Sequence, residues 1–486
     1  MIQSVLRVLA GLVGAVFLLM GLTFLLAPGR LMVQFGVFPS SNAGFSTLRG
    51  DLGGLFLGAA LLTLAGVVRA SRQWLSVSAL FIGLVAFGRI LSLLFDGFSS
   101  EALQALVAEL VMVGVLLSAA LSVRPGSMGR LRWAIPISVI ALLLGVLFLF
   151  QRRIGMALTK STVERTFSTQ FIATLPDGLH AGLCGSGSPL ADPTRAGPCV
   201  FVIAGKRMYV VDAGEGSPRK LTLMGLAPGL IDAILITHFH SDHIGGLGEM
   251  MLQRWAGAGH KDPLTVIGPQ GVESVVNGFN DAYALDKKYR VAHHGEATVP
   301  PSGAGGVARP FTLVDGSEAS QVVLQQDGLT ITAFAVPHAP VFPAAAYRFD
   351  YQGRSIVISG DTSPSQTLAK YAKGADVLFH EGLQTAMVSV LQEAASRNGR
   401  TTAAKILGDI PPYHTTPEDA AQTAQQAGVR QLIFYHTIPP LPFAYLNAAF
   451  LGDAAKIFKG PITVSKDGMM VSLLPGSTVV TMRELL

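Results

Sequence analysis

Three histidines and an aspartate fall within six residues, His238 to His243, directly after the apolar run 231–237. The run predicts a buried β-strand, because its apolar and β-branched residues are typical of strands inside a domain. Imidazole nitrogens and carboxylate oxygens at this density suit two divalent cations. A purely structural role would leave several buried polar atoms without partners, which is costly. The sequence therefore favours a metal centre at the end of a buried strand.

The motif His238-Phe239-His240-Ser241-Asp242-His243 resembles the HxHxDH signature of the metallo-β-lactamase superfamily. An ordered series of other motifs across residues 165–480 resembles the ribonuclease Z and arylsulfatase branch, and such a series is far more specific than one short pattern. The other motifs are Leu183-Cys184-Gly185-Ser186-Gly187-Ser188-Pro189, Val211-Asp212-Ala213-Gly214-Glu215-Gly216, Pro337-His338, Gly360-Asp361-Thr362, His380-Glu381-Gly382, Tyr413-His414-Thr415 and Tyr435-His436. The fold implied is α/β, a four-layer αββα sandwich with the metal site at one edge.

The resemblance implies two zinc ions per chain, each held by three residues, with one carboxylate between them. The expected ligands are His238, His240 and His338 for one ion, Asp242, His243 and His436 for the other, and Asp361 as the bridge. Each lies where a strand is expected to end, so the strands would fix the ligand positions. Two cations can share a hydroxide at neutral pH, so the metal-bound hydroxide is the expected nucleophile.

The resemblance also implies catalytic residues beside the metals. His414 matches a histidine that donates a proton to the leaving oxygen, and Glu381 lies where it could orient that imidazole. Asp242 is expected to be catalytic as well as a ligand. Asp212 is expected to orient a ligand rather than bind metal. The alternative for His414 is an exposed loop histidine, but an imidazole pKa near 6.5 suits proton transfer at neutral pH.

The other histidines receive different assignments. His380 is expected to be structural, and His180 and His260 are expected to lie on the surface. His293 and His294 would point to opposite faces of a strand, so neither is assigned a role.

The first 150 residues contain nine Arg, no Lys, no His and four acidic residues, whereas all eleven His lie from His180 onward. Apolar stretches in this part are long enough to cross a hydrocarbon core of about 30 Å. Five spans are expected, at Val5–Leu26, Leu52–Val68, Leu75–Phe95, Leu103–Leu121 and Ala134–Phe150. The first is longer than a signal-peptide core and has no cleavage pattern, so we expect it to remain in the mature protein.

The first four spans resemble a small bacterial membrane domain of unknown function. That resemblance rests on Leu25-Leu26-Ala27-Pro28, Leu48-Arg49-Gly50-Asp51, Gly88-Arg89-Ile90-Leu91-Ser92-Leu93 and Glu109-Leu110-Val111. The expected domains are an all-α transmembrane bundle at 1–126, a fifth transmembrane helix and linker at 127–160, and the hydrolase domain at 161–486. Arg89 and Glu109 are expected at matching depth, where pairing would avoid a lone buried charge.

Arginines in the short loops favour a cytoplasmic N-terminus, with six on one side and four on the other. Five crossings of a bacterial inner membrane then place the hydrolase domain in the periplasm. The Arg152-Arg153 pair after the last span argues for the opposite orientation. Cys184 and Cys199 could form a disulfide in an oxidising space, or could be two small buried side chains.

From residue 166 onward, short β-rich runs alternate with helical stretches such as Pro417–Ala427 and Tyr445–Phe458, which predicts a layered α/β domain. The Gly- and Pro-rich segment Gly295–Ala308 predicts a surface loop. Residues 151–486 carry equal numbers of basic and acidic residues, without the positive charge expected of a nucleic-acid-binding domain.

Ribonuclease Z enzymes carry a flexible arm for tRNA, but only 22 residues separate His338 from Asp361, and they predict a strand, a turn and a strand. The stretch His338-Ala339-Pro340-Val341-Phe342-Pro343 resembles arylsulfatase-type members. The expected function is therefore hydrolysis of a small ester, an arylsulfatase-like sulfate ester or a phosphodiester, next to a lipid bilayer. The alternatives are a ribonuclease Z-like phosphodiesterase acting on RNA, and a catalytically idle metal-binding module.

Overall fold

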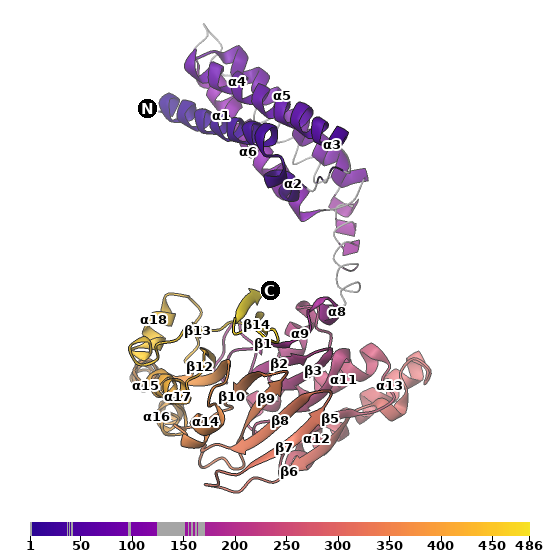
Figure 1. Cartoon of the computed structure of the whole chain (residues 1–486), viewed down its shortest axis with the longest axis vertical. Helices are drawn as coiled ribbons and strands as arrows, with labels where there is room; N and C mark the ends of the chain where they lie inside the picture. Colours follow the sequence, from indigo (N-terminus) through magenta and orange to yellow (C-terminus); the bar gives the residue numbers. More distant parts are fainter. Residues whose placement is uncertain are drawn as a thin grey trace. The chain divides into compact units, whose positions relative to one another are not determined.

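The computed structural model describes residues 2–35, 37, 39, 42–95, 99–123, 151–153, 155–156, 159–160, 163 and 171–486. The chain is divided into two compact units, residues 1–168 and residues 169–486 (Figure 1). The expected fifth span, Ala134–Phe150, lies outside the described residues, as does the expected boundary at 126–127.

The first unit is helical. Its elements are α1 (Ile2–Leu26), α2 (Gly29–Phe35), α3 (Asn42–Thr47), the π-helix η1 (Leu48–Gly53), α4 (Gly54–Val68), α5 (Arg72–Phe95) and α6 (Ser100–Ser122). Four helical stretches are long and apolar enough to cross a membrane, at Gln3–Leu26, Gly44–Val68, Arg72–Leu94 and Ser100–Ser122. They correspond to the first four spans that the sequence predicts.

Small residues let α1 and α4 approach closely. A Cβ atom added at Gly14 would lie 2.9 Å from the Leu64 side chain, and one at Gly21 would lie 2.8 Å from the Leu57 backbone. Glycine at such points is how apolar helices pack tightly without a water-driven force between them.

An ion pair joins α5 to α6, because Arg89 Nε lies 2.6 Å from Glu109 Oε1. The pairing predicted from their matching depth is therefore confirmed. Each charge satisfies the other at a position where a lone charge is expensive.

Two β-sheets form the centre of the second unit. The first has the order β15-β14-β1-β2-β3-β4-β5-β6 and the second β13-β12-β11-β10-β9-β8-β7. Strands of the first sheet are β1 (Leu179–Gly185), β2 (Cys199–Ala204), β3 (Arg207–Val211), β4 (Ile231–Leu235), β5 (Leu264–Pro269), β6 (Gly306–Phe311), β14 (Met469–Leu473) and β15 (Thr481–Glu484). Strands of the second are β7 (Ser320–Gln326), β8 (Leu329–Ala335), β9 (Ala345–Tyr351), β10 (Arg354–Ile358), β11 (Val377–Leu383), β12 (Gln431–Ile438) and β13 (Ile462–Val464).

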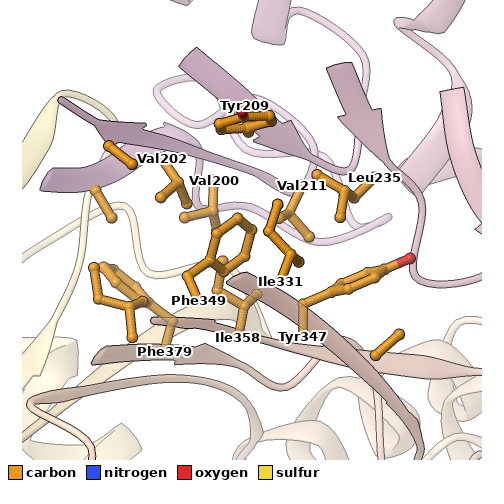
Figure 2. Packing of buried hydrophobic residues seen from close by; sticks show 14 of the residues in the cluster. Val200, Val202, Tyr209, Val211, Leu235, Ile331, Tyr347, Phe349, Ile358 and Phe379 are labelled. Atoms are coloured by element: carbon orange, nitrogen blue, oxygen red, sulfur yellow. The ribbon is translucent and has the colours of Figure 1, made fainter. Parts of the chain in front are cut away.

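Buried side chains from both sheets meet in one core (Figure 2). Val200 and Val211 from the first sheet face Ile331, Phe349 and Phe379 from the second. Burying such apolar surface stabilises the sandwich by roughly 25 cal/mol per Å².

Helices cover the outer faces of the sandwich (Figure 1). They are α8 (Phe171–Thr174), α9 (Ser217–Leu223), α10 (Ser241–Ile244), α11 (Leu247–Ala258), α12 (Val272–Ala282), α13 (Ala284–His294), α14 (Gln366–Tyr371), α15 (Thr385–Arg397), α16 (Thr401–Asp409), α17 (Pro417–Ala427), α18 (Leu446–Leu451) and α19 (Ala454–Ile457). Short 3₁₀ turns occur at Pro228–Leu230, Pro301–Gly303 and Pro411–Tyr413. The predicted αββα arrangement is therefore confirmed.

Several local predictions were wrong. The predicted helix Tyr445–Phe458 is two helices, because Gly452 interrupts it with a φ of +48°. The predicted loop Gly295–Ala308 is correct up to residue 305, and only its last three residues belong to the strand β6 instead. His180 is buried rather than exposed, because β1 lies between β2 and β14, and its Nδ1 is 2.8 Å from Ser472 Oγ.

Two other features concern the histidine pair and the cysteines. His293 and His294 end the helix α13 instead of lying in a strand, and both are exposed. Cys184 and Cys199 are joined by a disulfide that links β1 to β2. Of the two alternatives that the sequence left open for the cysteines, a disulfide or two small buried side chains, the structure has the disulfide.

Candidate active site

The predicted site residues gather at one edge of the sandwich, where several strands end. Strands β3 and β4 are parallel, and so are β10, β11 and β12, so their carboxyl ends lie at a common edge. Asp212 directly follows β3, while His238 comes three residues after β4 and Asp361 three residues after β10. Rigid strands ending together let the loops turn polar side chains toward one point.

All seven predicted ligands fall into two groups, the first of which contains Asp361. One ligand atom from each of His238, His240, His338 and Asp361 lies within 4.8 Å of the others, and the same holds for Asp242, His243 and His436. A third set at that spacing contains Asp361, His414 and His436. Asp361 therefore lies next to both groups, as a bridging ligand requires.

The donor atoms around Asp361 point inward without ordinary partners. Asp361 Oδ1 lies 3.3 Å from His243 Nε2, and its Oδ2 lies 3.3 Å from His436 Nε2 and 3.9 Å from both His238 Nε2 and His338 Nε2. The buried atoms Asp361 Oδ1, His243 Nε2 and His338 Nε2 have no hydrogen-bond partner among the described residues. Unpaired buried donors and acceptors are costly, and a divalent cation would satisfy all three. The donor set therefore fits a metal centre.

Outer contacts fix the orientation of two histidines. Nδ1 of His338 donates to the Tyr413 carbonyl oxygen at 2.8 Å. Nδ1 of His243 donates to Asp212 Oδ2 at 2.8 Å. Each contact leaves Nε2 as the atom that faces Asp361, which is how neighbouring acceptors set the tautomer of a metal-binding histidine. The contact of Asp212 with His243 is the one that its predicted orienting role requires, while the contact of His338 with the Tyr413 carbonyl was not predicted.

Two site residues have left-handed backbone conformations. Asp212 has a φ of +60° and His436 a φ of +45°, and both are buried. Such conformations cost energy in residues other than glycine and persist where the surroundings fix them, often at functional sites. Asp212 is held by Thr237, whose backbone N–H donates to Asp212 Oδ1 at 2.8 Å.

The histidine pKa values separate by group. Burial lowers the pKa of His238 and of His338, so both are neutral at pH 7. Burial also opposes charge on His243, but the carboxylates of Asp361 and others outweigh it and raise the pKa of His243 well above its usual range. The pKa of His436 is raised in the same way. Without metal, His243 therefore favours the protonated form, whereas His238 and His338 favour the neutral form.

His414 lies beside this centre. It is buried, so the alternative of an exposed loop histidine is wrong. Its Nδ1 is 3.4 Å from Glu381 Oε1, the nearest carboxylate oxygen in the described structure. Glu381 Oε1 also accepts a hydrogen bond from the Thr415 backbone N–H at 2.7 Å, which fixes the carboxylate. Glu381 is thus in position to hold the His414 ring, as the sequence predicts.

A cavity of about 440 Å³ opens over the metal-binding groups. His240, Asp242, Asp361, His414 and His436 form its polar floor. Its other lining residues are Pro189, Leu190, Ser241, Ala403, Ile406, Leu407, Ile410, Tyr413 and Ile438, so among the described residues no Lys or Arg lines it. Sequence reasoning missed this wall, because the helices α15 and α16 were not predicted.

Comparison with known proteins agrees with this geometry. The family profile "Metallo-beta-lactamase superfamily" matches residues 192–401. Ribonuclease Z of Mycobacterium avium (strain 104) is 35% identical over 292 residues, covering 60% of this chain and 96% of that protein. The chain belongs to the metallo-β-lactamase superfamily, and it is a metal-dependent hydrolase of ester bonds.

Other comparisons cover both units. Ribonuclease Z of Mycobacterium bovis (strain BCG / Pasteur 1173P2) is 33% identical over 299 residues, covering 61% of this chain and 99% of that protein. The crystal structure of human tRNase Z, short form, has 20% identity and a TM-score of 0.44, covering 61% of this chain and 99% of that one. Residues 5–120 match a "Domain of unknown function (DUF4345)", in line with the resemblance noted for the membrane domain.

Proposed function

We propose that the C-terminal unit hydrolyses a small phosphodiester or sulfate ester that has an apolar alcohol as its leaving group. The observation that carries this proposal is the lining of the cavity above Asp361, which is apolar on the side of α16. Pockets of this size and composition take small ligands, with a few polar groups fixing the orientation. The names of the relatives favour a phosphodiester over a sulfate ester.

Zinc at the two groups would lower the pKa of water toward neutrality and polarise the ester oxygens. His238, His240 and His338 would hold one ion, Asp242, His243 and His436 the other, and Asp361 would contact both. His414 donates a proton to the leaving oxygen, and Glu381 positions its ring. Ile406 and Leu407 shield the leaving group from water. Asp212 keeps His243 in the tautomer that leaves Nε2 free.

RNA is the second candidate, favoured by relatives that are named Ribonuclease Z. Two features speak for the smaller ester. The segment between His338 and Asp361 is the hairpin of β9 and β10, which leaves no room there for an arm. The described cavity lining also contains no Lys or Arg side chain that could bind the phosphates of RNA. Such phosphate contacts supply most of the affinity for nucleic acids.

Turnover of three substrates by the full-length protein tests the proposal. Bis(p-nitrophenyl) phosphate, p-nitrophenyl sulfate and a tRNA precursor with a 3′ extension are compared, with zinc content measured in the same samples. We expect turnover of the small esters, loss of turnover in Asp361→Ala, and no tRNA cleavage. Cleavage of the tRNA alone would establish the second candidate. If the protein binds its full zinc content but hydrolyses none of the esters, the catalytically idle metal-binding module is the alternative that remains.

We further propose that the N-terminal helices anchor the chain in a bacterial inner membrane, with the catalytic unit in the periplasm. Four helices suit a membrane by length and composition. The disulfide between Cys184 and Cys199 supports the periplasm, because such bonds persist in oxidising compartments. Alkaline phosphatase fused after Leu486 should be active and a fluorescent protein dark. The reverse pattern would place the catalytic unit in the cytoplasm.

A further inference from the structure

The loop after β12 exposes two aromatic side chains. Phe443 is 70% exposed and Tyr445 is 96% exposed, in the segment 439–445, which we call the aromatic loop. Leu441 in the same segment is buried in the core formed with α17 and β12, so the loop is anchored at its base. Aromatic rings held this far out in water are unfavourable unless another surface covers them.

The aromatic loop shares one face of the catalytic unit with the C-terminal strand. Leu441, Pro442 and Ala444 of this loop line a surface hollow of about 760 Å³ whose other lining residues include Met482, Arg483 and Glu484 of β15, and Leu486. The side chains of Met482 and Leu486 are exposed apolar groups. Figure 1 shows α18, the C-terminus and α8 along one side of this unit. The hollow has four basic lining residues and two acidic ones, the basic ones being Arg195, Lys220, Lys466 and Arg483.

The chain enters the catalytic unit at this same face. Phe171 is the first residue of α8 and follows the segment that connects the two units. The Arg483 guanidinium of β15 lies 4.8 Å from the centre of the Phe171 ring. The first helix of the catalytic unit therefore begins beside β15.

We propose that this face, made of the aromatic loop, β15 and α8, rests on the lipid bilayer, with Phe443 and Tyr445 in the headgroup region. The inference rests on the proposed membrane anchorage. Aromatic rings favour the membrane–water interface, and basic residues beside them attract anionic phospholipids. An anchored face of this kind would hold the catalytic unit in one orientation on the membrane.

The proposed contact places the cavity mouth close to the lipid. Ile438 lines the catalytic cavity and directly precedes the aromatic loop. Arg195 lines the hollow and donates a hydrogen bond to Thr437 Oγ1, and Thr437 lies in the chain between His436 and Ile438, which both line the catalytic cavity. An ester whose apolar leaving group is buried in the bilayer would enter the cavity from this side.

Spin labels on the full-length protein test the contact. Tyr445→Cys is labelled after reconstitution into vesicles of phosphatidylcholine and phosphatidylglycerol, and the native cysteines do not react because they are joined. The matched control is Tyr289→Cys on α13, where the native tyrosine is 65% exposed. We expect oxygen to relax the label at 445 more than a water-soluble nickel chelate does, and the opposite for the label at 289.

If the two labels are equally accessible to nickel in a chain that floats with the vesicles, the proposed contact of this face with the bilayer is wrong, but the proposed membrane anchorage still holds. A chain that does not float would overturn both.

Activity gives a second readout through the double variant Phe443→Ser, Tyr445→Ser. It should lose turnover of an alkyl nitrophenyl phosphodiester carried in the vesicles, and keep the wild-type rate on soluble bis(p-nitrophenyl) phosphate. Equal rates on the vesicle substrate would contradict the proposal.

Discussion

Replacing Asp212 by Asn tests how the site holds its second metal group. Asp212 Oδ1 accepts from the Thr237 backbone N–H at 2.8 Å, and Oδ2 accepts from His243 Nδ1 at 2.8 Å. Asn has the same size and tolerates the φ of +60° at this position. Its oxygen must face the Thr237 N–H, so its NH₂ group faces His243. Nδ1 must then accept a hydrogen bond, and the ring proton moves to Nε2, the atom that faces Asp361.

The expected cost follows from this change of tautomer. A ring with its proton on Nε2 cannot offer that nitrogen to a cation. Losing an orienting partner of a metal-bound histidine typically lowers metal affinity by about 10- to 100-fold, which is about 1.4 to 2.7 kcal/mol. In the first group, His238 contacts Asp212 only indirectly, because its Nδ1 lies 3.1 Å from Thr237 Oγ1, which itself donates to Asp212 Oδ1 at 3.1 Å. The Thr237 hydroxyl can still donate to the Asn oxygen, so the first group should keep its affinity.

Competition with a chromogenic zinc chelator measures both affinities in the purified full-length protein. We expect two zinc ions in the wild type, and one normal and one weakened ion in Asp212→Asn. Asp376→Asn is the matched control, since Asp376 is also buried but pairs with Arg354 at 3.0 Å, away from the site. It should lower stability and leave zinc binding intact. Two unchanged affinities in Asp212→Asn would refute the reasoning, and complete loss of one ion would make Asp212 a ligand.

Three other predictions follow from the contacts. His414→Ala should keep both metals and lower turnover by about 100- to 10,000-fold for poor leaving groups and far less for nitrophenolate; an equal loss for both would contradict proton donation. Zinc binding at pH 7 should release a proton from the second group, because the pKa of His243 is raised well above its usual range, which favours the protonated ring without metal, and a ligand must be neutral. Calorimetry in buffers of different ionisation enthalpy would show this, with less release above this raised pKa. Arg89→Leu and Glu109→Leu should each lower the thermal midpoint in detergent more than the double variant does, because each alone leaves an unpaired charge; additive losses would exclude a functional pairing.

The metal centre was predictable because its chemistry is concentrated in short motifs. His238 to His243 supply four of the seven expected ligands, and the strand before them is apolar enough to be recognised. The Arg89–Glu109 pair was predictable for a similar reason, since helix geometry alone fixes depth in a membrane. His180 was not, because its burial depends on the distant strand β14 pairing with β1. Local sequence patterns predict the structure of one segment, and they fail where contacts with a distant segment determine the burial of a residue.

The cavity wall belongs to that second class, and in the proposed function it is the part that selects the substrate. Ile406, Leu407 and Ile410 in the sequence look like one apolar helix face turned to a core. In the structure Leu407 and Ile410 pack against a small core cluster that contains Val388, whereas Ile406 is 55% exposed and lines the cavity. The same holds for Phe443, whose exposure depends on how Leu441 anchors its loop. The motifs therefore define the superfamily and its metal-dependent ester hydrolysis, whereas the surfaces that we propose to select the ester come from segments without any motif.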